Sequence, residues 1–423
     1  MHDFEYKQGT LYCADVPLKK IAGEVGTPFY CYSLPTLRRH VRAFEDPLTG
    51  VDHQTCFAMK ANSSLAILSF MAAQGLGADV VSGGELYRAI KAGIPGNKIV
   101  YSGVGKTTEE IDMAINAGIM MFNIESEQEL EVINERAGRL GKKAPISVRV
   151  NPDVDPKTHP YISTGMRNNK FGIDIEGSMT QYLRAKDMEN IEIVGIDCHI
   201  GSQLTEVSPF IDAAGRLKVL IEKLAGHGVN FRYLDLGGGL GITYSDEEPP
   251  HPKDYCSAIL HAVGPLGLKL IFEPGRVIVG NTGVLVSEVL YRKVTGTKTF
   301  IIVDAGMNDL LRPALYGAYH EIRPLTKRQG ETIKADVVGP ICESSDFLAK
   351  DRELPDLQRG DMIAVMSAGA YGYTMASNYN SRPKPPEVLV DGSSYYVISN
   401  RESYEDLLSG ESTPDIPGLT GGR

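Results

Sequence analysis

Short apolar runs alternate with longer amphipathic stretches over the first two thirds of the chain. Most runs are rich in Val, Ile or Phe and stop at Gly, Ser, Asn or Pro, as buried parallel strands do. The segments between them are long enough for helices. Eight strand–helix units predict a (β/α)8, TIM-like barrel, with an open doubly wound sheet as the alternative. The predicted strands are Thr55–Met59, Ala78–Val81, Lys98–Tyr101, Met120–Ile124, Ile146–Val150, Gly195–His199, Tyr233–Leu236 and Leu268–Phe272.

The pattern changes after residue 280. Segments such as GVLVSEVLYRKV, KTFIIVDAG and DMIAVMSAGAYG alternate more strictly and are separated by turn residues. This pattern is typical of an antiparallel β-domain. The segment TPFYCYS near the N-terminus also reads as a strand that joins this domain. We therefore predict a barrel over residues 35–280 and a mainly antiparallel β-domain formed by residues 1–34 and 281–423.

Composition narrows the classes of function. The 423 residues carry a formal charge of −10, which argues against nucleic acid or an anionic membrane as the main partner. The N-terminus lacks a secretory signal, and no apolar run approaches the ~18 residues of a membrane span. The six cysteines form no CxxC pair, which fits a reducing compartment. We expect a soluble, cytoplasmic protein, and we predict no metal site.

Candidate chemistry gathers where the predicted strands end. Active sites of (β/α)8 barrels are built at the carboxyl ends of the strands. A lysine, an acid, a histidine, a serine, a glycine run and an EPGR segment stand at these ends. They are Lys60, Asp79, His199, Ser202, Gly237 to Gly239, and Glu273, Pro274, Gly275 and Arg276. Their convergence on one barrel edge indicates a catalytic site.

Each residue has a structural reading beside the chemical one. Lys60 is a surface residue, a phosphate ligand or an amine that forms a Schiff base. The glycine run is a plain turn or a close backbone approach to a phosphate. Ser202 caps a helix or donates a hydroxyl. Glu273 pairs with the following arginine or faces a pyridine nitrogen. His199 is a core histidine or a ring stacked on a cofactor.

Several motifs together carry a family resemblance. FAMKAN, GADVVSGGEL, HIGSQ, LDLGGGLGI, EPGR, GPICESSD and GAYGY occur in order between about residues 25 and 405. In this they resemble the fold-type III decarboxylases that depend on pyridoxal phosphate (PLP). The motifs MNDLLRPALYGAYH, CESSD and YNSRP resemble those of the diaminopimelate decarboxylase family in particular. The resemblance implies an alanine racemase-like pair of domains, PLP as the cofactor, and a homodimer whose active site is shared between subunits. It also implies decarboxylation of meso-2,6-diaminopimelate to L-lysine and CO2, the last step of lysine biosynthesis.

The resemblance also implies roles for single residues. Lys60 would carry the cofactor as a Schiff base, His199 would stack on its ring, and Glu273 would bond the ring nitrogen. Cys342 would supply a proton from the partner subunit. Residues that would surround the phosphate or lie near the cofactor are Asp79, Ser202, Gly238, Gly239, Pro274, Gly275, Arg276 and Tyr371. Substrate would contact Arg276, Arg312, Tyr316, Glu343 and Tyr371.

The chemistry of the substrate favours diaminopimelate over shorter amino acids. Its far end carries an ammonium and a carboxylate, which Glu343 and Arg312 can bind. An unpaired arginine would disfavour ornithine by about 1–3 kcal/mol. Other readings stay open: a related PLP decarboxylase acting on ornithine, arginine or a carboxylated polyamine, an amino-acid racemase, a Schiff-base aldolase, or a catalytically silent homologue.

Overall fold

A computed structural model of the chain describes residues 2–155, 169–296, 298–328 and 330–414. The chain divides into two compact units. The first comprises Met1–Asp3, Ser33–Gly283 and Ser367–Thr374, and the second comprises Phe4–Tyr32, Val284–Met366 and Met375–Arg423. Part of the predicted barrel (156–168) and parts of the predicted β-domain (1, 297, 329 and 415–423) lie outside the described residues.

The first unit is a closed barrel of eight parallel strands. Each strand pairs with the next, and the eighth pairs with the first, as in the contact of Leu270 with His53. The predicted barrel is confirmed, and each observed strand overlaps the apolar run that predicted it. The strands are β5 (His53–Ala58), β6 (Gly77–Val80), β7 (Ile99–Tyr101), β8 (Met121–Ile124), β9 (Ala144–Asn151), β11 (Ile191–Asp197), β12 (Tyr233–Asp235) and β13 (Lys269–Phe272). A short strand, β10 (Ile173–Asp174), pairs with β9.

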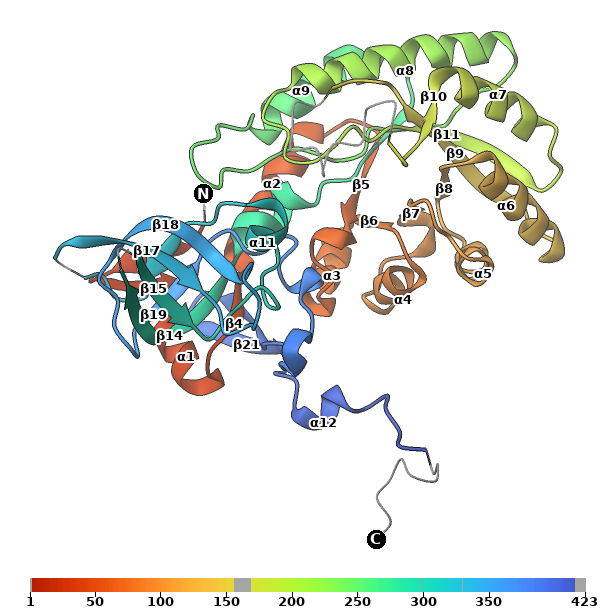
Figure 1. Cartoon of the computed structure of the whole chain (residues 1–423). Coiled ribbons are helices and arrows are strands. Elements are labelled where there is room, and N and C mark those ends of the chain that lie inside the picture. Colours follow the sequence, from red (N-terminus) through yellow and green to blue (C-terminus); the bar gives the residue numbers. More distant parts are fainter. Residues whose placement is uncertain (1, 156–168, 297, 329, 415–423) are drawn as a thin grey trace. The chain divides into compact units, whose positions relative to one another are not determined.

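Helices follow the strands and lie on the outside of the barrel (Figure 1). They are α2 (Leu34–Glu45), which precedes β5, and then α3 (Leu65–Ala73), α4 (Gly83–Lys91), α5 (Thr108–Ala117), α6 (Glu127–Arg139), α7 (Ile175–Lys186), α8 (Ser208–Gly226), α9 (Pro252–Val263) and α10 (Arg276–Val279). Ser82, Thr107 and Ser126 each cap a helix by accepting a backbone N–H three residues on. Such caps fix the residue at which each helix begins. They therefore also fix the position of the residues between the helix and the end of the preceding strand.

The second unit is mainly antiparallel. Its main sheet has the order β18–β17–β15–β14–β4–β20–β21; β19 also pairs with β14, and β16 pairs with β19. The pair β15–β17 is parallel, whereas β14–β15, β14–β19, β16–β19, β17–β18 and β20–β21 are antiparallel. The segment TPFYCYS forms β4 within this sheet, as predicted. The strands of the main sheet are β4 (Phe29–Ser33), β14 (Gly283–Thr295), β15 (Lys298–Val303), β16 (Ile322–Pro324), β17 (Thr332–Val338), β18 (Phe347–Pro355), β19 (Met362–Val365), β20 (Glu387–Asp391) and β21 (Ser394–Ser399).

The described residues of this unit also form a small three-stranded sheet and three α-helices. They are β1 (Phe4–Lys7), β2 (Thr10–Cys13), β3 (Val16–Pro17), α1 (Leu18–Val25), α11 (Arg312–Tyr316) and α12 (Tyr404–Leu407). Side chains from the small sheet and α1, among them Phe4 and Ile21, share one buried cluster with Val284 and Val388. Burial of this apolar surface joins the N-terminal segment to strands more than 250 positions away in the sequence. Among the described residues, no helix combines the length and the hydrophobicity that a membrane crossing requires.

Candidate active site

Lys60 lies at the carboxyl end of the first barrel strand. A single 3-10 turn, Met59–Ala61, follows β5 and carries it. Its Nζ donates to Oδ2 of Asp79 at 3.0 Å, and Asp79 is fully buried at the end of the neighbouring β6. The parallel register, in which Ala58 faces Asp79, brings the two residues together. Burial alone would lower the pKa of Lys60, but the carboxylates of Asp79 and Glu273 outweigh it and raise this pKa. A protonated amine thus forms an ion pair with a buried carboxylate at the barrel mouth, meaning the edge formed by the carboxyl ends of the strands.

The glycine run after β12 is packed against its neighbours too closely for side chains. A Cβ on Gly237 would lie 2.7 Å from Nδ1 of His199, and one on Gly238 would lie 2.1 Å from the carbonyl oxygen of Glu273. Gly239 has a φ of +119°, which other residues rarely adopt. Backbone bonds join the same segments, since the N–H of Glu273 donates to the oxygen of Gly237 at 2.8 Å. Gly237 and Gly238 are buried, and the half-buried Gly239 places backbone without a side chain at the mouth.

His199 follows β11 and is half-buried. The N–H of Gly238 donates to its Nδ1 at 3.2 Å, so this nitrogen carries a lone pair. Burial lowers the pKa of His199 well below its usual value, and the positive charges of Lys60 and Arg149 lower it further. The ring is therefore neutral, with its proton on Nε2. A flat, neutral ring of this kind can lie against another aromatic plane.

Glu273 follows β13 and belongs to a group of buried acids. It is 4% exposed, and its Oε1 has no hydrogen-bond partner among the described atoms. Carboxylate oxygens of Asp197, Asp235 and Glu273 lie within 4.8 Å of one another, which is close enough to hold a metal ion. Burial raises the pKa of Glu273 well above its usual value, and Asp235 and Asp79 raise it further. A cationic group placed against Glu273 would relieve this repulsion and keep the carboxylate ionised.

Arg276 joins three parts of the mouth. Its Nη2 donates to Oγ of Ser202 at 2.9 Å, and its Nη1 donates to the hydroxyl of Tyr244 at 2.7 Å. The guanidinium also lies 4.8 Å from the ring centre of Tyr371. The N–H of Tyr371 in turn donates to the carbonyl oxygen of Ala61, next to the lysine, at 2.8 Å. A fixed cation and two hydroxyls, those of Ser202 and Tyr244, form a group suited to an anion such as a phosphate.

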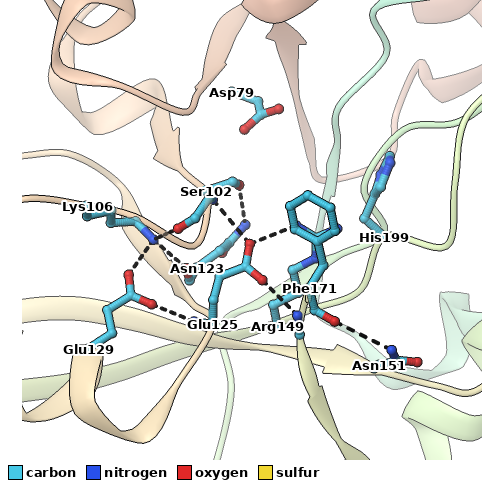
Figure 2. A network of polar contacts seen from close by, with 12 residues as sticks. Asp79, Ser102, Lys106, Asn123, Glu125, Glu129, Arg149, Asn151, Phe171 and His199 are labelled. Carbon is cyan, nitrogen blue, oxygen red and sulfur yellow. Dashed lines mark hydrogen bonds and ion pairs between the residues drawn. The ribbon is translucent and has the colours of Figure 1, made fainter. Parts of the chain in front are cut away.

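A polar network lines the ends of three further strands, and Figure 2 shows it together with Asp79 and His199. Oε1 of Glu125 accepts from Nη1 of Arg149 at 2.8 Å, and its Oε2 accepts from the N–H of Gly172 at 2.7 Å. The buried amine of Lys106 bonds the carbonyl of Asn123 and the carboxylate of Glu129. This network gives each of its buried charges a partner and stiffens the side of the barrel mouth opposite Lys60.

Two predicted residues of the second unit lie on an exposed loop. Cys342 and Glu343 follow β17 and precede β18, and both are solvent-exposed. The N–H of Cys342 donates to Oδ1 of Asn380 at 2.8 Å, and the hydroxyl of Tyr379 donates to Oε2 of Glu343 at 3.1 Å. The motifs CESSD and YNSRP therefore touch one another. Asp346 stabilises this loop, because its Oδ2 accepts the N–H of Ile341 at 2.6 Å.

The other two predicted residues of the second unit, Arg312 and Tyr316, lie on one short helix. Arg312 begins α11 and is 6% exposed, while Tyr316 ends it and is half-buried. Gly317, with a φ of +62°, ends the helix in the left-handed conformation. Nη1 of Arg312 lies 2.8 Å from Nε2 of His320, which is fully buried.

The structure brings together the predicted residues of the barrel mouth: Lys60 with Asp79, His199 with Gly238, and Ser202 with Arg276 and Tyr371. Sequence reasoning missed Arg149, Tyr244 and His320. A signal existed for Arg149, because a charge inside the apolar run ISVRV is unusual for a buried strand. Tyr244 and His320 lie in loops where the sequence gives no comparable signal.

Comparisons with known proteins identify the family of this chain. A profile of the family described as pyridoxal-dependent decarboxylase, pyridoxal binding domain, matches residues 34–280. Diaminopimelate decarboxylase of Vibrio cholerae is 52% identical over 414 residues, which cover 97% of this chain and 99% of that protein. The enzyme of the same name from Pseudomonas aeruginosa is 50% identical over 412 residues, with coverage of 97% and 99%.

Solved structures give the same result. Diaminopimelate decarboxylase of Helicobacter pylori, complexed with L-lysine, superposes with a TM-score of 0.90 at 45% identity and covers 93% of this chain and 98% of that one. The M. jannaschii enzyme, also with L-lysine, gives a TM-score of 0.94 at 40% identity, with coverage of 99% and 100%. The chain therefore belongs to the pyridoxal-dependent decarboxylases, and within them to the diaminopimelate decarboxylase family.

Proposed function

We propose that this chain decarboxylates meso-2,6-diaminopimelate to L-lysine and CO2, the last step of lysine biosynthesis, with PLP as its cofactor. The observation that carries the proposal is the pairing of Lys60 with the buried Asp79 at the same barrel edge as the buried Glu273. It stands in a chain about half identical to diaminopimelate decarboxylases over nearly its whole length.

The residues at the mouth fit PLP. Glu273 has a buried oxygen with no hydrogen-bond partner among the described atoms, and a protonated pyridine nitrogen is the donor that would satisfy it. Lys60 would hold the aldehyde carbon covalently, and His199 would lie against the ring. When bound, PLP takes up the electron pair left by the departing CO2. Residues proposed to surround the phosphate or lie near the cofactor are Asp79, Ser202, Gly238, Gly239, Pro274, Gly275, Arg276 and Tyr371.

The residues proposed to handle the substrate are Arg276, Arg312, Tyr316, Glu343 and Tyr371. Arg312 would bind the distal carboxylate with its planar fork of donors, and Glu343 would accept from the distal ammonium. Tyr316, Arg276 and Tyr371 would complete the contacts. Loss of CO2 breaks a carbon–carbon bond, and one proton must then be added to the same carbon. Cys342 would deliver that proton, since a thiol exchanges protons readily near neutral pH.

A direct assay tests the activity. Purified protein with PLP and meso-diaminopimelate should form lysine and CO2 in equal amounts, and the Lys60→Ala variant should form neither. Ornithine and arginine in parallel incubations should release far less CO2, because they have no distal carboxylate for Arg312. Release of CO2 from ornithine but not from diaminopimelate would overturn the proposed substrate.

We also propose a cytoplasmic homodimer with a shared active site. All six cysteines are free thiols, which fits a reducing compartment. Cys342 and Glu343 are exposed, so they are accessible to a partner subunit. When the variants Lys60→Ala and Cys342→Ala are mixed and allowed to exchange subunits, about a quarter of the parental activity should return. Half of the dimers are then heterodimers, and each of these has one intact site of its two. No recovery after verified exchange would show that each subunit supplies its own thiol.

A further inference from the structure

Arg312 is buried against a histidine that the proposed function leaves unassigned. Nη1 of Arg312 lies 2.8 Å from Nε2 of His320, and Nδ1 of His320 lies 2.8 Å from the carbonyl oxygen of Met366. His320 is fully buried, and Arg312 is 6% exposed. The three groups form one chain of hydrogen bonds within the second unit.

The partners fix the protonation of the ring. A guanidinium can only donate, so Nε2 of His320 must accept from Arg312. A carbonyl can only accept, so Nδ1 must carry the proton and donate it to Met366. His320 is therefore neutral, with a single tautomer. A second ring proton would place two N–H groups face to face and break the contact with Arg312.

Backbone pairing holds the histidine in this place. Strands β16 and β19 pair with each other so that Ile322 lies opposite Val365. The pairing continues one step further, because the N–H of Met366 donates to the carbonyl oxygen of Glu321 at 2.8 Å. Nη1 of Arg352 donates to the carbonyl oxygen of His320 at 2.9 Å. Both the ring and the backbone of His320 are thus held before any ligand binds.

We infer that His320 is a positioning residue for substrate specificity: it orients the guanidinium of Arg312 toward the distal carboxylate of the substrate. The inference rests on the proposed function, because it takes the ligand of Arg312 to be that carboxylate. A long arginine side chain has many conformations, and an acceptor on one nitrogen fixes the plane of the fork. A substrate that lacks the distal carboxylate gains nothing from this arrangement.

Two conservative variants separate positioning from simple packing. In His320→Gln the side-chain oxygen can reach the position of Nε2 and accept from Arg312. In His320→Asn the shorter amide reaches only the position of Nδ1, so it keeps the bond to Met366 and loses the one to Arg312. We expect His320→Asn to raise KM for diaminopimelate about tenfold or more, and His320→Gln to stay within about threefold of the parent. In both variants kcat and the visible absorption of the bound cofactor should be nearly unchanged.

A double-mutant comparison tests the route of the effect. If His320 acts through Arg312, adding His320→Asn to Arg312→Ala should not raise KM beyond the value for Arg312→Ala alone. The inference is overturned if Asn preserves KM as well as Gln does, if the two changes add, or if kcat falls at constant KM. A parent enzyme that releases no CO2 from diaminopimelate would instead refute the proposed function itself, so the two failures are distinguishable.

Discussion

Replacing Glu273 by glutamine removes the charge that this carboxylate would carry against a bound cation, and the two side chains have nearly the same volume. Glu273 is 4% exposed, and one of its oxygens has no hydrogen-bond partner among the described atoms. If this carboxylate faces the ring nitrogen of PLP, it keeps that nitrogen protonated. A glutamine amide would instead offer a donor or a neutral acceptor, and the ring would lose its proton and much of its capacity to accept electrons.

The structure sets the size of the effect. A hydrogen bond between a charged donor and acceptor contributes about 1.5–3 kcal/mol, which corresponds to a loss of roughly 10- to 150-fold in kcat. The near-complete burial of Glu273 favours the upper part of this range, because little water screens the interaction. The assay is the rate of CO2 release at saturating diaminopimelate, with cofactor content checked by absorption at about 420 nm, the region of a PLP Schiff base.

A matched control is the same change at Glu387, which is 3% exposed and accepts the hydroxyl of Tyr32 at 2.7 Å in the second unit. Glu387→Gln should lower the free energy of unfolding and leave kcat within about twofold. If Glu273→Gln with full cofactor content kept kcat within about threefold of the parent, the proposed contact with the ring nitrogen would be wrong.

Further predictions concern the proton donor, substrate recognition and stability. Cys342→Ala should keep the absorption band of the cofactor on Lys60 and lose most turnover, and unchanged turnover would exclude the thiol as proton donor. Arg312→Ala should raise KM for diaminopimelate by about tenfold or more without changing cofactor affinity, as measured by PLP titration. The hydrogen bond to Glu45 raises the pKa of His53. This pair should therefore stabilise the fold below the unfolded pKa of about 6.5 and lose that effect as pH rises through the folded value. His53→Gln should cost about 0.5–1 kcal/mol of unfolding free energy at acidic pH and less at alkaline pH, and a constant cost in denaturant titrations would contradict the assignment.

The sequence predicted the barrel because its strands are buried on both faces and read as short apolar runs. Lys60 was found because it directly follows such a run, where a lysine has few structural reasons to stand. Strand ends were less certain: β9 begins at Ala144 and β11 at Ile191, each earlier than its apolar run predicted. Pro145 and Glu192 interrupt the apolar pattern at these two strand starts, so the pattern alone placed both starts too late.

The contacts of the site were harder to predict than its residues. The bond of Arg276 to Tyr244 depends on the path of the loop after the glycines, which tertiary packing determines. Arg312 meets His320 only because α11 ends at Gly317 in the left-handed conformation and the chain then turns into β16. The parallel pairing of β15 with β17 inside a mainly antiparallel sheet likewise has no local signature.

Closure of the barrel has a consequence for how the enzyme matures. Lys60 follows the first strand and Glu273 follows the last, and the N–H of Ala58 donates to the oxygen of Pro274 only where those two strands meet. During synthesis the lysine leaves the ribosome long before its acidic counterpart exists. A nascent chain therefore cannot form the complete pocket until all eight strands of the barrel have been synthesised. Binding of PLP then indicates that the domain has finished folding. Excess cofactor should then favour late, nearly complete folding states over early ones.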